Sequence, residues 1–524
     1  MERKSRARSA AVLLLLVFSL FGVTACGRGE KGGMTGSFPV KLAAEGSYLI
    51  MASQDASKDY IDALTVAQDL HRNALTETFT PEDISSAESI LTRHKPRYAM
   101  VFLKPEELDV NFAWAWLTMI AELDEDPFAD VRTGFITGES PEKVLLFLTR
   151  IREAVEGRLK LPLQAVDNLG PNTMMGKTGF QKQKGSFMIP VLTGQFPVYT
   201  ISHGIQGFSK ERLLSMDGSG IVHFGGHGYP DRIVDCLNGP YARQLKLSPC
   251  AVFNGACYTG VTGKWFELFN ASGKVKEHSV DPGTSFAFGI LGNSAVAYCA
   301  ALHPDHGIPV YQEMEYLCYS GASLGDMMKY TYDGVVIGAG GKLPRFERLK
   351  GGMPSPRWAP ADIMLKGTAS RVLFGDPSMV LCEAFTGQPF TISVKQIDDR
   401  TLQIRAALSN LQLKSTYSDT YHADLSKDKT LFNDRAMVAA PLPEGWGAVK
   451  GIKVEKMSSG SKELVHRPVG YALEKDGEKS ILHVQVDVPS SGYMSSEFRQ
   501  AGAEAVINVT RDLPSPRPPS SKRE

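Results

Sequence analysis

Short, unbroken apolar runs that end abruptly in small residues are the feature that most limits how this chain can fold. Between residues 220 and 382 the runs include IVHFGG (221–226), CAVFNGA (250–256) and NSAVAYCAAL (293–302), separated by polar or glycine-rich turns. Runs without polar alternation are typical of strands that are buried on both faces of a parallel sheet. Upstream, two further apolar runs flank a helical pattern, as in a strand-helix-strand unit. The pattern predicts an α/β fold with a parallel sheet.

One helix is predicted with clear boundaries, after the strand-like segment 128–137. Ser140 is a suitable N-cap, and Pro141 is at the first helical position, where the missing N–H has no cost. Gly157 can end the helix. Between them, one face carries four apolar residues that should pack on the sheet: Val144, Leu148, Ile151 and Val155.

The character of the sequence changes after residue 385. FTISVKQ, TLQIRAAL, ILHVQVDV and AEAVINVT alternate polar and apolar residues and are separated by polar turns. This period of two predicts a small antiparallel β-sandwich.

The N-terminus combines a basic start, MERKSRARS, with the apolar run AAVLLLLVFSLFGV, as secretory signal peptides do. The next residues, VTAC, resemble a bacterial lipobox, whose cysteine, here Cys26, receives a lipid. An ordinary signal peptide with an incidental cysteine is the alternative. We expect an exported protein that is anchored in the bacterial cell envelope by a lipid on Cys26. Gly27 is compatible with the outer membrane, and a host with a single membrane is the alternative.

Charge and cysteine usage exclude several other classes of protein. Lys plus Arg and Asp plus Glu both number 57, and no long basic run appears, so no nucleic-acid partner is predicted. The seven cysteines have no metal-ligand spacing and make no dense disulfide framework. No cofactor or metal site is predicted, and a structural calcium ion cannot be derived from the sequence.

Two of the predicted strands end at reactive side chains. His227 follows the run 221–226 directly and Cys257 follows the run 250–256. If the strands are neighbours, both side chains reach the carboxyl edge of the sheet, where sites form in α/β proteins. An imidazole can deprotonate a thiol or stabilise its anion, and the N–H groups of Gly228 and Cys257 could form an oxyanion hole. The pattern predicts Cys257 as a nucleophile and His227 as its base.

At these motifs the chain resembles the caspase-like cysteine peptidases, and within them most closely the gingipain family. The resemblance covers about residues 45–385 and includes several segments besides the two motifs. They are FADVRTGFITGESPEKVLLFLTRI (128–151), GNSAVAYCAALHPDHG (292–307), GASLGDMMKY (321–330) and VLFGDPSMVL (372–381). The family implies an α/β/α sandwich around a parallel sheet, followed by an immunoglobulin-like β-sandwich.

The resemblance also implies roles for individual residues. Cys257 would form a thioester acyl-enzyme with a peptide or protein substrate, with His227 as general base and Gly228 as an oxyanion donor. Asp130 matches the family's acid near the histidine and would orient the imidazole. One departure is Phe135, which follows the central glycine of its strand where the family usually has Arg.

This reading divides the chain into six parts. They are a signal peptide (1–25), a flexible tether (26–44), an N-terminal α/β subdomain (45–165), a catalytic α/β subdomain (166–385), a β-sandwich (386–512) and a disordered tail (513–524).

Alternatives exist for most of the polar residues near the site. His203 also ends an apolar run with His-Gly, but the match to the family segment favours His227. Glu139 and Asp231 are candidates to bind a basic substrate side chain, and so are Glu142 and Asp235, although each could be a solvated surface acid. Other polar residues are given structural roles: His223 packed in its strand, His303 and His306 in a loop without further metal ligands, and Asp376 as a turn cap.

Two further hypotheses compete with a general endopeptidase. One is an inactive gingipain fold that serves as a binding or scaffold lipoprotein. The other is a peptidase with a narrow role, such as processing one partner or itself.

Overall fold

The structure is a computed structural model, and it describes a set of separate ranges of the chain. They are 36–43, 46–169, 181–184, 197–202, 217–234, 236–245, 247–268, 270–305, 313–314, 317, 322–342, 345–356, 366–382, 390–408, 414–417, 432–446, 448–459, 462–463, 467–476, 479–490 and 503–511. The predicted signal peptide, Cys26, most of the predicted tether and the predicted C-terminal tail fall outside these ranges.

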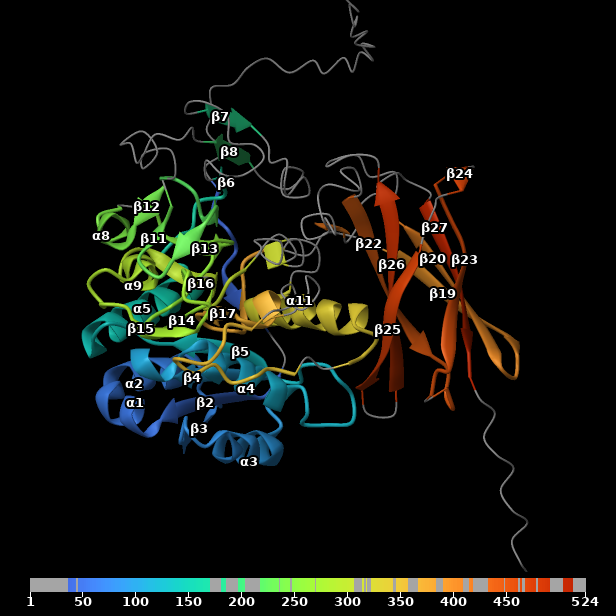
Figure 1. Cartoon of the computed structure of the whole chain (residues 1–524), viewed down its shortest axis with the longest axis horizontal. Coiled ribbons are helices and arrows are strands. Elements are labelled where there is room, and N and C mark those ends of the chain that lie inside the picture. The colour runs from blue at the N-terminus through green and yellow to red at the C-terminus, as the bar shows by residue number, and fades with distance from the viewer. Residues whose placement is uncertain are drawn as a thin grey trace, which may run out of the picture. The chain divides into compact units, whose positions relative to one another are not determined.

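An eleven-stranded sheet organises the chain before residue 383 (Figure 1). Its strands are β2 (Tyr48–Ser53), β3 (Leu75–Phe79), β4 (Tyr98–Phe102), β5 (Arg132–Ile136), β6 (Ala165–Leu169), β7 (Gln181–Lys184), β8 (Val198–Ser202), β9 (Ile221–Gly225), β13 (Cys250–Asn254), β16 (Ala295–Ala301) and β17 (Arg371–Phe374). They lie in the order β3-β2-β4-β5-β17-β16-β13-β9-β6-β8-β7. This confirms a large, mostly parallel sheet in a mixed α/β fold.

The sheet is not parallel throughout, which corrects the prediction. Strands β16 and β17 pair antiparallel, as do β7 and β8 at one edge. Apart from β7, the strands on each side of the β16–β17 junction run parallel to one another. The carboxyl ends of β9, β13 and β16 therefore lie at the same edge as the amino ends of β17 and β5. An apolar strand carries no mark of its direction, so the sequence could not reveal this reversal.

The described residues also form helices around the sheet. They are α1 (Gln54–Asp59), α2 (Ile61–Leu70), α3 (Ile84–His94), α4 (Val110–Ile120), α5 (Pro141–Val155), α8 (Gly239–Ala242), α9 (Phe286–Leu291) and α11 (Leu324–Gly338). Helices α5 and α9 contact β16, and α11 contacts β5 and β17. In the part of the chain that the structure describes, no helix is both long and apolar enough to span a bilayer.

The predicted boundaries of α5 are confirmed. The Ser140 side chain accepts a hydrogen bond from the Lys143 N–H, and Pro141 is the first helical residue. Gly157, just beyond the helix, has a φ of 73°, a left-handed conformation that glycine adopts without strain. Of the four residues predicted to face the sheet, Val144, Leu148 and Ile151 are buried, and Val155 is half-buried.

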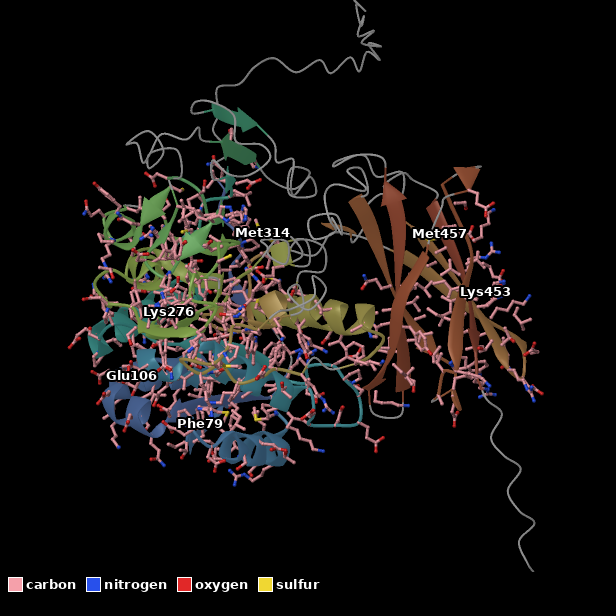
Figure 2. All side chains as sticks on the ribbon, in the orientation of Figure 1. Phe79, Glu106, Lys276, Met314, Lys453 and Met457 are labelled. Atoms are coloured by element: carbon pink, nitrogen blue, oxygen red, sulfur yellow. The ribbon has the colours of Figure 1, made fainter. Side chains whose placement is uncertain are left out.

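A single hydrophobic core runs through both predicted α/β subdomains, from Phe38 to Cys382, and includes Phe79 (Figure 2). Because β17 lies between β5 and β16, residues 45–165 and 166–385 share one sheet. The folded part also begins earlier than the predicted tether allows. Phe38 is buried, and strand β1 (Lys41–Leu42) pairs with β18 (Met379–Val380).

The C-terminal region forms two antiparallel sheets around a separate core. One contains β19 (Phe390–Asp398), β20 (Thr401–Leu408), β23 (Gly451–Ser459), β24 (Lys462–Glu463) and β27 (Ala503–Thr510). The other contains β21 (Lys414–Tyr417), β22 (Phe432–Leu442), β25 (Arg467–Asp476) and β26 (Lys479–Ser490). Ile404, Leu482 and the labelled Met457 belong to the shared core (Figure 2). The two sheets fit the predicted β-sandwich, and its immunoglobulin-like character stays a prediction.

Gly134 offers a test of the packing between β5 and the turn after β17. A Cβ atom there would overlap the Gly375 carbonyl oxygen and lie 2.9 Å from Cδ of Pro377. We expect Gly134→Ala to lower the free energy of unfolding by about 1–3 kcal/mol, as overpacked sites do. Gly351→Ala is the control, because its nearest atom is a side-chain carbon at 3.3 Å. Urea denaturation of both variants measures the effect, and equal midpoints would contradict this packing.

Candidate active site

The two strands that carry the predicted catalytic residues are neighbours in the sheet. Strands β9 and β13 run parallel with Phe224 opposite Asn254, and the Gly255 N–H donates to the Phe224 carbonyl over 2.8 Å. Both strands end there, at the same edge. The turns that contain His227 and Cys257 therefore begin side by side.

The turn after β13 is held by its own polar groups. Asn254 is fully buried, and its Oδ1 accepts a hydrogen bond from the Ala256 N–H over 2.8 Å. Tyr258 has a φ of 62°, which is unusual for a bulky side chain. Its hydroxyl donates to the Phe266 carbonyl over 3.2 Å, and its ring packs edge-on against Trp265. These contacts hold the strained turn, which leaves Cys257 half-buried at the rim of the sheet.

Gly228 brings the two turns into contact. It begins β10 (Gly228–Tyr229), which forms a small sheet with β11 (Arg232–Ile233) and β12 (Leu237–Asn238). A Cβ atom on Gly228 would overlap the Cys257 carbonyl oxygen and lie 2.8 Å from the Ala256 Cβ, so only glycine fits. The N–H groups of Gly228 and Cys257 both act to lower the pKa of the Cys257 thiol. The two N–H groups predicted for an oxyanion hole thus face the sulfur.

The Cys257 sulfur makes two hydrogen bonds with the backbone of Asp305. Its S–H donates to the Asp305 carbonyl over 2.9 Å, and the Asp305 N–H donates to the sulfur over 3.2 Å. Burial, and then the negative charge of Asp305, raise the pKa of the thiol to about 11 despite the neighbouring N–H groups. In this resting geometry Cys257 is a neutral thiol at pH 7.

Sequence reasoning missed the charged cluster beneath this turn. The Arg371 side chain, at the start of β17, binds Asp305 Oδ2 through Nη1 at 2.5 Å and Glu313 Oε2 through Nη2 at 2.8 Å. Nη1 also donates to the Asn254 carbonyl over 2.9 Å. All three charged side chains have no exposed surface. The available signal was an arginine beginning an otherwise apolar strand, because a buried charge needs a partner.

His227 lies in the turn between β9 and β10. Its carbonyl accepts a hydrogen bond from the Val234 N–H over 2.8 Å, and its side chain is exposed. Because the adjacent Gly228 touches the backbone of Cys257, the two residues share one rim. For the thiol proton to reach the imidazole, the S–H must first leave the Asp305 carbonyl.

Comparison with known proteins finds few likenesses. No protein-family model matches the chain, and no curated protein matches its sequence. Among solved structures, the complex of the pro- and mature domains of RgpB from Porphyromonas gingivalis has a TM-score of 0.43 at 12% identity, covering 88% of this chain and 99% of that chain. A chain described as the structure of a protease has a TM-score of 0.43 at 10% identity, covering 88% and 97%. Neither likeness is strong enough to carry an argument. The gingipain family stays a resemblance.

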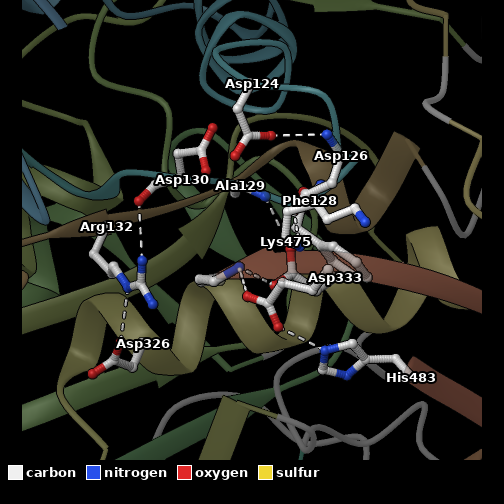
Figure 3. Close-up of polar contacts among 12 residues, drawn as sticks. Asp124, Asp126, Phe128, Ala129, Asp130, Arg132, Asp326, Asp333, Lys475 and His483 are labelled. Carbon is white, nitrogen blue, oxygen red and sulfur yellow. Dashed lines mark hydrogen bonds and ion pairs between the residues drawn. The ribbon is translucent and has the colours of Figure 1, made fainter. Parts of the chain in front are cut away.

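The structure does not bring Asp130 to His227, which corrects its predicted orienting role. Asp130 precedes β5, and the strand order puts four spacings between β5 and β9, or roughly 19 Å. Figure 3 shows Asp130 near Asp124 and Arg132 instead, with the Arg132 guanidinium donating to the Asp130 carbonyl. Burial, followed by the charges of Asp124 and Asp126, raises the pKa of Asp130 to about 7.

The two predicted substrate-binding acids, Glu139 and Asp231, lie at different places relative to Cys257. Glu139 follows β5, whose carboxyl end lies at the edge opposite to Cys257, and it pairs with Arg243 at 2.7 Å. Its predicted role is therefore wrong in this geometry. Asp231 lies in the turn between β10 and β11 and pairs with Arg232 at 2.8 Å, so it stays a candidate beside the site. Of the alternatives, Glu142 is exposed on α5 and Asp235 lies outside the described residues.

Of the other histidines weighed in the sequence analysis, the two that the structure describes are buried. His223 is buried, and its Nδ1 lies 2.7 Å from Asp167 Oδ1 on β6. His303 is also buried, which lowers its pKa to about 3. His203 and His306 lie outside the described residues. Within the described ranges, no group of three His, Cys, Asp or Glu residues is arranged to hold a metal ion.

Asp376 caps its turn as predicted and also has other partners. Its carboxylate accepts hydrogen bonds from the Ser378 N–H over 2.9 Å and from the Tyr48 hydroxyl over 2.9 Å. Nε2 of His71 lies 2.6 Å from its second oxygen. Asp376 therefore ties β2 and the end of α2 to the turn after β17.

The raised pKa of Asp130 predicts how stability depends on pH. Because its pKa rises from about 3.9 in the unfolded chain, the folded state holds the proton more tightly, and this contribution is lost as the pH rises from 4 to 7. In Asp130→Asn this pH-dependent loss of stability is removed, because the Asn side chain does not ionise. A shift of about three pKa units corresponds to about 4 kcal/mol, and the partial exposure of Asp130 reduces it. We therefore expect the variant's free energy of unfolding, relative to wild type, to improve by about 1–2 kcal/mol between pH 4 and pH 8. Urea denaturation at both pH values measures this.

Asp62→Asn, at an exposed position on α2, is the matched control and should show no such trend. An orienting acid would instead lose most activity on substitution to Asn. A drop in peptide hydrolysis with unchanged stability would therefore restore the original assignment of Asp130.

Proposed function

We propose that the chain is a cysteine endopeptidase with Cys257 as nucleophile and His227 as general base. The observation that carries the proposal is the backbone contact between Gly228 and Cys257, because it joins the His-Gly turn and the cysteine turn at one rim. The N–H groups of Gly228 and Cys257 supply the oxyanion donors. The resemblance to gingipains in separate sequence segments adds to this support.

The reaction follows from the positions of these groups. His227 takes the thiol proton, and the thiolate attacks the scissile carbonyl to form a tetrahedral oxyanion that the two N–H groups bind. The carbon–nitrogen bond breaks, the imidazolium gives its proton to the leaving amine, and a thioester remains on Cys257. Water activated by His227 then hydrolyses the thioester and releases the acid. Since the resting thiol is protonated, substrate binding must bring the imidazole and sulfur together before the first step.

An inactive fold that binds a partner is the second candidate. One observation favours it, namely the thiol pKa of about 11, set by burial and by Asp305. A nucleophile that is fully protonated at neutral pH reacts slowly unless its proton is removed on binding.

Hydrolysis of a positional peptide library distinguishes the two candidates. We expect the wild-type protein to cleave a subset of peptides and Cys257→Ala to lose about a thousandfold or more of the rate, because no other group forms the acyl-enzyme. Cys382→Ala, which removes another free but buried cysteine, should keep its activity. If the folded wild-type protein cleaves nothing, or Cys257→Ala cleaves equally well, the peptidase proposal fails and the binding protein is favoured.

We also propose that the protein is exported and anchored in the cell envelope by a lipid on Cys26, which lies outside the described residues. In bacteria fed a labelled fatty acid, the wild-type protein should carry the label and partition with membranes. Cys26→Ser should carry none and appear in the soluble fraction. A labelled Cys26→Ser protein, or an unlabelled wild type, would contradict the anchor.

A further inference from the structure

Arg371 joins three separate segments behind the nucleophile. It binds the carbonyl of Asn254 at the end of β13, the carboxylate of Asp305 after β16, and the carboxylate of Glu313. Burial alone would lower the pKa of Arg371, but Glu313 and Asp305 outweigh it and raise the pKa, so the guanidinium is charged. The cluster therefore places a charged guanidinium between two carboxylates, with no exposed surface on any of the three side chains.

Asp305 connects Arg371 to the Cys257 sulfur. Its side chain is held by Arg371, while its backbone both accepts the S–H and donates to the sulfur of Cys257. One residue therefore satisfies the thiol as donor and as acceptor. The orientation of the sulfur depends on where the Asp305 backbone lies, and that depends on Arg371.

We propose that Arg371 is a positioning residue for the Cys257 thiol, because it binds the Asp305 side chain and so fixes the Asp305 backbone that holds the sulfur. In catalysis this cluster keeps the sulfur beneath the Gly228 N–H until the proton is transferred to His227. Only this last step rests on the proposed peptidase function. The contacts that position the thiol do not depend on whether the chain is a peptidase.

Several charged or titratable groups face this cluster from the surrounding elements. The Asp305 carboxylate acts on the thiol from the loop after β16, and Tyr258 follows Cys257 directly. Arg371 on β17 and Glu313 lie behind Asp305, and His223 on β9 acts on Glu313. His227 shares the rim. Among these groups, Asp305 has the largest charge effect on the thiol, so its removal gives the clearest change.

The pH dependence of alkylation by iodoacetamide tests the proposal without using peptidase activity. Mass spectrometry of the peptide containing Cys257 gives its rate at each pH. In the wild-type protein the rate should rise about tenfold per pH unit up to a midpoint near 11, because the thiolate reacts. In Asp305→Asn the midpoint should fall by about one unit or more, which raises the rate at pH 8 about tenfold.

Two further variants complete the experiment. Arg371→Lys keeps the charge but cannot bridge three partners, so the thiol should loosen and react about threefold or more faster at pH 8. Asp333→Asn breaks another buried ion pair, with Lys329 at 2.5 Å, and should leave the midpoint unchanged while lowering stability.

The proposal is overturned if Arg371→Lys keeps the wild-type rate, if Asp305→Asn keeps the wild-type midpoint, or if Asp333→Asn shifts the midpoint equally. If Asp305→Asn does not fold, Arg371→Lys decides, and a wild-type rate in that variant overturns the proposal. The outcome is separate from the peptidase question. A shifted midpoint in Asp305→Asn, together with a wild-type protein that cleaves no peptide, supports the positioning role and rejects the peptidase. An unchanged midpoint, together with peptide cleavage by the wild-type protein, supports the peptidase and rejects the positioning role.

Discussion

The buried ion cluster of Arg371, Asp305 and Glu313 is the constraint on which the rest of the site depends. A charge without exposed surface must be paired, and removing one partner of such a pair costs about 3–5 kcal/mol. The cluster therefore cannot rearrange freely. Because the same guanidinium also binds the end of β13, it ties the strand that precedes Cys257 to the loop that holds the Cys257 sulfur.

The reversal of strand direction between β16 and β17 explains why this cluster exists. It puts the amino end of β17, with Arg371, at the edge where β13 and β16 end. In a sheet that was parallel throughout, Arg371 would lie at the opposite edge, away from Cys257. The same reversal puts Asp130 at the edge of the sheet that carries Cys257 and Glu139 at the opposite edge, while the strand order keeps Asp130 four strand spacings from β9.

In the proposed peptidase, the resting Cys257 thiol would be a latent nucleophile. It is half-buried, neutral at pH 7 and bound to a backbone carbonyl, yet two N–H groups suited to an oxyanion already face it. Positioned donors lower a barrier most when they need no reorganisation during the reaction. In the proposed reaction, the oxyanion donors are in place before substrate binds, and the proton transfer to His227 follows binding.

The sequence alone determined the local features of this protein. Helix α5, with its Ser140 cap, and the turns after β9 and β13 follow from residue types at short spacing, because capping and strand endings are local interactions. The β-sandwich pattern after residue 385 is local in the same sense. Gly228, beside His227, could also be identified from the sequence. The residue that requires a glycine there, Cys257, lies in another segment of the chain.

Only the tertiary structure decided which distant segments meet. The strand order placed β17 between β5 and β16. The direction of β17 then brought Arg371 beside Asp305, which is 66 positions away in the chain. The apolar strands are alike in pattern, so pairing depends on packing across the whole sheet rather than on any one of them. For the same physical reason the sequence could propose Asp130 and Glu139 for the site, and only the fold could remove them.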